Sequence, residues 1–150
     1  GFVVGSKNVV QAYAEVKDNV DSGQFKAIQL AACTGIANRA LADGLKDHYE
    51  KRLRNLVAAL QKAGFEAAMP GGTFYLYVPA PKRAGPVEFA DAEEASQFLI
   101  KEHMISTVPE DAAGSFLRFS ATFESAGESD DDRVIEELTR RLKSAALEWD

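Results

Sequence analysis

The chain has 150 residues, of which 46% are hydrophobic and 27% are charged, and this composition is typical of a globular domain with a real core. Its net charge of -6 and the absence of a basic stripe exclude a nucleic-acid surface as its main feature. No apolar run is long enough to cross a membrane. The single cysteine, Cys33, cannot form an internal disulfide, which favours a reducing, cytoplasmic compartment.

The first 41 residues predict a strand followed by two helices. The continuous apolar run "GFVVG" is typical of a strand that is buried on both faces. Helical spacing follows, and a turn at "DSG" separates it from a second helical stretch that begins at Phe25 and runs through "KAIQLAACTGIANRAL". Cys33 lies among small residues in this stretch, so we expect it to be a buried, inert thiol.

A long amphipathic helix is predicted over 42–63, with Gly64 as its C-terminal cap. Strands are predicted over 65–69, 71–79, 104–109 and 115–123, and "PAPKRAGPV" is predicted to be a loop. A capping box of Asp91 and Glu94 indicates the start of one helix, and a last helix begins near Ser129. The fold class is therefore α/β, or an α+β layer, with a mostly antiparallel sheet that has helices packed on one face.

One strand carries the first candidate binding residue. In "SFLRFSATF", Leu117, Phe119, Ala121 and Phe123 alternate with Phe116, Arg118, Ser120 and Thr122, which indicates one buried face. Arg118 then lies on the other face. It is either a solvated or cross-strand-paired arginine, or a rigid fork that binds a carboxylate with two hydrogen bonds. The residue pattern alone leaves both interpretations open.

A second candidate lies at "MPGGTFYLYVP". Gly71 and Gly72 either form a simple turn or let the backbone approach a ligand, and Phe74 and Tyr75 are expected on opposite faces. His48 and His103 lack metal-ligand spacing, so no metal site is predicted.

These segments together resemble the C-terminal part of the class I/II aminotransferases, the fold-type I enzymes that use pyridoxal phosphate. The resemblance covers the whole chain through "GFVVGS", "DNVDSGQFKAIQLAA", "PGGTFYLYVP" and "STVPEDAAGSFLRFSATF". Within the family, "DSGQFKAIQ" and "GGTFYLYVPAP" look closest to bacterial LL-diaminopimelate aminotransferases. The resemblance implies a remnant of the large cofactor-binding domain over 1–38 and the small C-terminal domain over 39–150.

The resemblance also implies roles for particular residues. Arg118 matches the arginine that binds the substrate α-carboxylate, and Phe74 and Tyr75 match the strand start that lines the substrate pocket. Ser22 and Gln24 match an interface loop near the cofactor of the partner subunit in a homodimer. The substrates implied are an amino acid, either LL-diaminopimelate or aspartate/glutamate, and a 2-oxo acid.

The chain departs from the family pattern at the catalytic residues. The family's Schiff-base lysine would lie just before Gly1, and Lys7 follows the strand and does not match it. We therefore expect an inactive C-terminal fragment that binds no pyridoxal phosphate, with no catalytic residue of its own. The alternative is a freestanding, non-catalytic α/β module that binds a small carboxylate or a protein partner through the Arg118 face.

Overall fold

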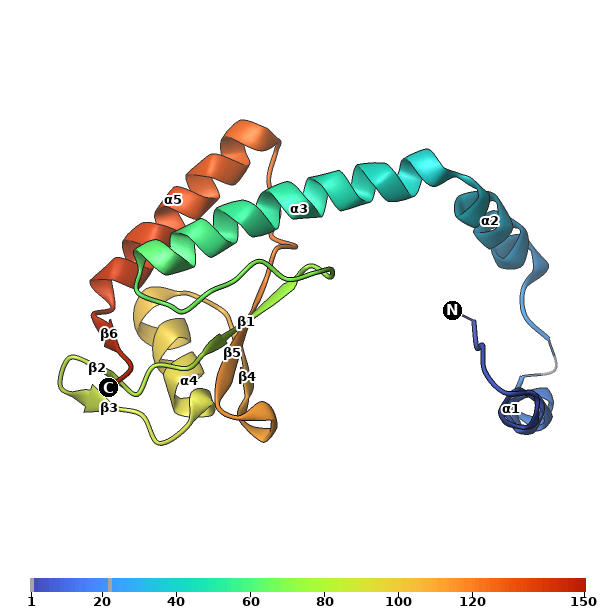
Figure 1. Ribbon diagram of the computed structural model, residues 1–150, viewed down its shortest axis with the longest axis horizontal. Helices are drawn as coiled ribbons and strands as arrows, with labels where there is room; N and C mark the ends of the chain where they lie inside the picture. The colour runs from blue at the N-terminus through green and yellow to red at the C-terminus, as the bar shows by residue number, and fades with distance from the viewer. Residues whose placement is uncertain (1, 22) are drawn as a thin grey trace. The chain divides into compact units, whose positions relative to one another are not determined.

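The computed structural model describes residues 2–21 and 23–150, and the chain divides into two compact units, Gly1–Gly44 and Leu45–Asp150. Figure 1 traces the elements of both units in chain order. Among the described residues, no helix combines the length and the hydrophobicity that crossing a membrane requires.

The first unit contains α1 (Lys7–Val20), α2 (Lys26–Ala37) and the first residues of α3 (Arg39–Lys62). Neither α1 nor α2 has a buried residue, and apolar side chains such as Val16 and Ile28 are exposed. The predicted strand at the start of the chain is wrong, because residues 2–4 form no regular structure and Phe2 is 80% exposed. A strand requires hydrogen bonds to a neighbouring strand, and the described part of this unit offers none.

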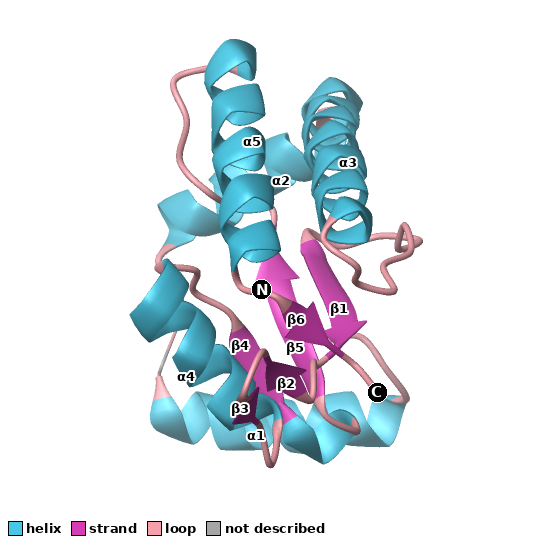
Figure 2. Cartoon of the chain, turned by 90° about the vertical axis from the view of Figure 1, so that its left-hand side faces the viewer, coloured by secondary structure: helices cyan, strands magenta, loops and turns pink. Residues whose placement is uncertain are grey.

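The second unit is built on a three-stranded antiparallel sheet with the order β1-β5-β4. Its strands are β1 (Tyr75–Pro79), β4 (Val108–Glu110) and β5 (Phe116–Ser120), and β5 is the central strand. The helices α4 (Ala92–His103) and α5 (Glu128–Ser144) complete the unit with the rest of α3 (Figure 2). The expected α/β class with an antiparallel sheet is therefore confirmed.

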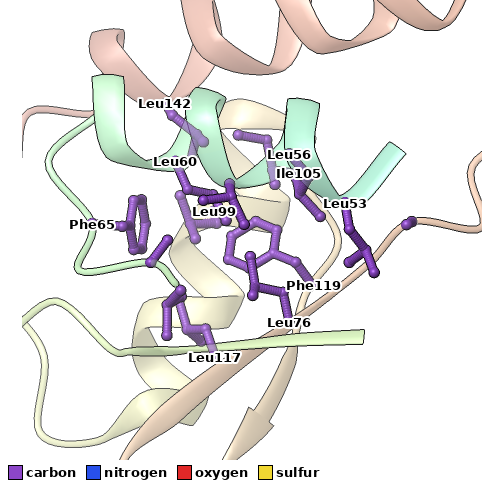
Figure 3. Close-up of a cluster of buried hydrophobic side chains, with 14 of the residues drawn as sticks. Leu53, Leu56, Leu60, Phe65, Leu76, Leu99, Ile105, Leu117, Phe119 and Leu142 are labelled. Atoms are coloured by element: carbon purple, nitrogen blue, oxygen red, sulfur yellow. The ribbon is translucent and has the colours of Figure 1, made fainter. Parts of the chain in front are cut away.

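The hydrophobic core lies between the helices and one face of this sheet. Figure 3 shows Leu53, Leu56 and Leu60 of α3 among the buried side chains of the cluster. Their neighbours come from both sheet and helices: Leu76, Leu99, Leu117, Phe119 and Leu142. Because Leu117 and Phe119 are buried at alternate positions of β5, the predicted strand alternation is confirmed.

Local capping signals are also confirmed. Gly64 has φ 94°, and the Phe65 amide donates to the Leu60 carbonyl at 3.0 Å, so α3 ends in a Schellman motif. At the start of α4, the Asp91 side chain accepts a hydrogen bond of 2.9 Å from the Glu94 amide.

In the second unit, one predicted strand does not form, and three short strands form that were not predicted. The stretch 65–69 forms no strand, although Phe65 and Ala67 are buried. The predicted loop at "PAPKRAGPV" instead contains β2 (Arg83–Ala84) and leads into β3 (Val87–Glu88), and both belong to a small sheet with β6 (Leu147–Glu148). Two-residue strands are too short to produce a period-2 pattern, so the sequence carries no signal for them.

Candidate functional site

Arg118 lies at the centre of the sheet, on the face opposite the core. In the ladders, Tyr77 of β1 and Val108 of β4 are directly opposite Arg118 of β5. Directly opposed residues project from the same face of a sheet, so these three side chains share a face with Arg118 in the middle. Because β5 is hydrogen-bonded to a strand on each side, the backbone at Arg118 has a fixed position.

The guanidinium of Arg118 has an ion-pair partner and an aromatic partner. Its Nη1 lies 3.1 Å from Oε1 of Glu110, and its Cζ lies 4.6 Å from the centre of the Tyr75 ring. Its Nε is buried and has no hydrogen-bond partner in the structure. The side chain is 28% exposed, so the group is only partly solvated. A planar, partly exposed cation on the outer face of a sheet is chemically suited to binding a carboxylate.

Aromatic side chains continue from Arg118 toward α3. The ring centres of Tyr75 and Phe74 are 4.4 Å apart, and those of Phe74 and Tyr49 are 5.5 Å apart. Rings so close do not lie on opposite faces, so that expectation for Phe74 and Tyr75 is wrong. The reason is that β1 begins only at Tyr75, and Phe74 precedes the pleated part of the strand. The structure thus brings Phe74, Tyr75 and Arg118 into one continuous set of contacts.

Two polar residues of this face, Tyr77 and Glu110, were not predicted from the sequence. Tyr77 donates a hydrogen bond of 3.1 Å through its hydroxyl to Oε1 of Glu110, the oxygen that pairs with Arg118. The period-2 pattern of β1 places Tyr77 on the Tyr75 face, and that signal could have identified it. Glu110 had no such signal, because the predicted strand ended at Pro109.

The residues expected near a cofactor do not form a site by themselves. Ser22 lies outside the described residues. Gln24 is exposed, and its backbone carbonyl accepts a 3.2 Å hydrogen bond from Nε2 of Gln29. None of the described residues in 2–21 and 23–44 is buried, so they provide no enclosed pocket for a ring and a phosphate. This part of the chain does not fit pyridoxal phosphate on its own.

Among the described residues, no catalytic arrangement forms around the remaining candidates, Cys33, His48 and His103. Cys33 is exposed, so the predicted burial of its thiol is wrong: α2 has no buried face. The ring of His48 packs against Tyr49, and Nδ1 of His103 lies 3.4 Å from Oγ of Ser144. Within the described residues, no group of three His, Cys, Asp or Glu side chains could hold a metal ion.

Comparison with known proteins extends this picture. The chain is 45% identical to the LL-diaminopimelate aminotransferase of Methanocaldococcus jannaschii, and the match covers 99% of this chain and 38% of that protein. It is 47% identical to the enzyme of the same name from Methanococcus maripaludis, over 94% of this chain and 35% of that protein. The chain therefore spans little more than a third of the length of these relatives.

Solved structures share the fold. The substrate-bound structure of BacF from Bacillus subtilis matches 98% of this chain and 36% of its own, with a TM-score of 0.78 and 24% identity. A double mutant of the Thermus thermophilus aspartate aminotransferase matches 91% of this chain and 35% of its own, with a TM-score of 0.71 and 26% identity. The model of the family "Aminotransferase class I and II" matches residues 1–133, and the chain therefore belongs to the class I and II aminotransferases.

Proposed function

We propose that this chain is the C-terminal part of a pyridoxal-phosphate-dependent aminotransferase and that Arg118 binds the α-carboxylate of its substrate. The family uses this cofactor. The observation that carries the proposal is the position of Arg118 on the central strand of the sheet, with a partly exposed guanidinium against an aromatic ring. This arrangement provides a positioned cation for a carboxylate, which orients the rest of the substrate.

The reaction proposed for the whole protein is the transfer of an amino group between an amino acid and a 2-oxo acid. LL-diaminopimelate is the first candidate donor, because the relatives with 45% and 47% identity are named for it. Aspartate and glutamate are the second candidates. Phe74 and Tyr75 would line the pocket beside the bound carboxylate, since their rings continue from the arginine.

The organisation of the whole protein is also a proposal. Residues 1–38 would belong to the large cofactor-binding domain and residues 39–150 to the small domain. Ser22 and Gln24 would approach the cofactor of a partner subunit in a cytoplasmic homodimer. Exposed apolar residues on α1 and α2 support a requirement for further protein surface around the first unit. The 150-residue chain alone would be inactive, because its residues do not enclose the cofactor.

The test compares the chain alone with a longer protein that includes the coding sequence upstream of it. We expect the longer protein, loaded with pyridoxal phosphate, to transfer the amino group of LL-diaminopimelate to 2-oxoglutarate. Arg118→Lys keeps the charge but loses the planar fork. Loss of one charge-assisted hydrogen bond, about 1.5–3 kcal/mol, predicts a roughly ten- to hundredfold lower kcat/KM.

Two results would contradict the proposal. One is unchanged kcat/KM in the Arg118→Lys variant of the longer protein. The other is a stoichiometric cofactor absorbance band from the 150-residue chain, with one lysine trapped by borohydride and located by peptide mapping. Carboxylate binding by the chain together with an inactive longer protein would favour the freestanding binding module.

A further inference from the structure

The carboxylate of Glu110 forms an ion pair with Arg118, the residue proposed to bind the substrate carboxylate. It reaches Nη1 of Arg118 at 3.1 Å, and the two side chains have nearly equal exposure, 28% for Arg118 and 27% for Glu110. The Glu110 side chain is thus an internal carboxylate, and its oxygen occupies one of the two terminal nitrogens of the guanidinium. A ligand that needs both terminal nitrogens meets an arginine that is already paired.

The sheet itself explains why Glu110 reaches Arg118. Val108 is directly opposite Arg118, and Glu110 lies two residues further along β4. A residue two positions along is the diagonal neighbour on the same face, which long side chains reach. The pair therefore follows from the strand register.

Two further contacts hold Glu110 in this position. The Tyr77 hydroxyl, which comes from the opposite edge strand β1, donates to the same Glu110 oxygen at 3.1 Å. Asp111, the next residue in the chain, accepts hydrogen bonds from the backbone amides of Ala92 at 2.8 Å and Glu93 at 3.2 Å at the start of α4. The end of β4 is thereby anchored to a helix, and the Glu110 side chain is restrained by a strand on the far side of Arg118.

We infer that Glu110 sets the carboxylate affinity of the Arg118 site by acting as a built-in competitor that an incoming carboxylate displaces. Displacing the Glu110 carboxylate from Arg118 costs little free energy. Both side chains retain contact with water, and ion pairs that remain in contact with water contribute little to stability. The paired state keeps the guanidinium aligned and neutralised until a ligand arrives. This inference rests on the proposed role of Arg118 as the carboxylate-binding residue.

The experiment titrates the 150-residue chain with succinate and follows the amide NMR signals of β5. Glu110→Gln preserves the size of the side chain and removes its charge, and we expect it to bind succinate about two- to fivefold more tightly than the unaltered chain. Glu66→Gln is the matched control, because it removes the same charge from an exposed residue in the segment after α3. It should leave the affinity unchanged. Arg118→Gln should abolish binding.

The outcomes separate this inference from the proposed function. If Arg118→Gln abolishes binding while Glu110→Gln binds succinate equally or more weakly than the unaltered chain, competition by Glu110 is refuted and the role of Arg118 stands. An equal gain in the Glu66→Gln control would assign the effect to net charge and also refute competition. If succinate moves no β5 signal in the unaltered chain or in Glu110→Gln, both proposals fail.

Discussion

Removal of the buried side chain of Arg52 is predicted to destabilise the second unit strongly. Arg52 lies on α3 and is 8% exposed. Its Nε and Nη2 donate to the two carboxylate oxygens of Asp131 at 3.0 and 2.8 Å. Its Nη1 donates to the carbonyls of Ala121 at 3.2 Å and Phe123 at 2.7 Å, and its Nη2 also reaches Oγ of Ser125 at 2.7 Å. One guanidinium thus joins α3, the segment after β5 and α5.

Arg52→Met removes all of these donors and keeps a long apolar side chain. The Asp131 carboxylate, 7% exposed, and two backbone carbonyls would then lack their partner. Breaking a buried pair by removing one partner costs about 3–5 kcal/mol. A domain of this size has a total stability of roughly 5–15 kcal/mol, so the variant should lose a large part of it.

Urea unfolding of the chain, followed by circular dichroism and by Trp149 fluorescence, measures the loss. The matched control is Arg54→Met on the same helix, because Arg54 is 66% exposed and pairs with Glu50 one turn away. Such a pair contributes about 0.3–0.5 kcal/mol. In the double variant Arg52→Met/Asp131→Leu, replacement of the whole pair by apolar groups should recover part of the stability. A loss below about 1 kcal/mol in Arg52→Met would refute this argument.

The Arg52–Asp131 pair also predicts that the stability of the second unit depends on pH. The hydrogen bonds from Arg52 hold the pKa of Asp131 below its usual value of 3.8. A carboxyl whose pKa is lowered on folding contributes stability that is complete above the unfolded value and is lost as pH falls through the folded value. The difference in unfolding free energy between the unaltered chain and Arg52→Met should therefore narrow below pH 3.8. A difference in unfolding free energy that stays constant until Asp131 is fully protonated would contradict this prediction.

Three further predictions concern other parts of the second unit. Leu60→Ala in the core should lower the unfolding free energy by about 2–5 kcal/mol, and a loss under 1 kcal/mol in urea unfolding would contradict the packing. Gly64→Ala should cost more than about 1 kcal/mol, because φ is +94° and its Cβ would lie 3.2 Å from the Trp149 ring; unchanged stability and fluorescence would oppose this. Hydrogen bonds from Arg140 and Arg141 lower the pKa of Glu137 to about 2. Arg140→Ala should therefore raise the pKa of Glu137, as measured by NMR titration. An unchanged pKa would contradict the pairing of Arg140 with Glu137.

Features fixed by neighbours along the chain could be predicted from the sequence. The alternation of β5, the end of α3 at Gly64 and the Asp91 cap of α4 each depend on residues within one or two turns. The same local logic failed at "GFVVG" and "FEAAM". These runs have the composition of strands, but a strand forms only where another strand supplies its hydrogen bonds.

The candidate site divides in the same way. The sequence pattern placed Arg118 on the outer face of its strand, because that requires only the period of β5. Its partner Glu110 depends on the register between β4 and β5, and the aromatic contact with Tyr75 depends on the register between β1 and β5. No single-sequence pattern carries those registers, so the ion pair and the Tyr77 hydrogen bond appear only in the structure.

Arg52 and Arg118 illustrate why a charge inside an apolar pattern has no single interpretation. Both arginines are next to buried leucines, Leu53 in α3 and Leu117 in β5. Arg52 is enclosed because α5 brings Asp131 to it from 79 residues away, whereas Arg118 lies on the outer face of the sheet, where its side chain remains 28% exposed. The first arginine holds the carbonyls of Ala121 and Phe123, directly after the strand that displays the second. Loss of Arg52 should therefore disturb β5 and weaken carboxylate binding at Arg118, although Arg52 itself contacts no part of that face.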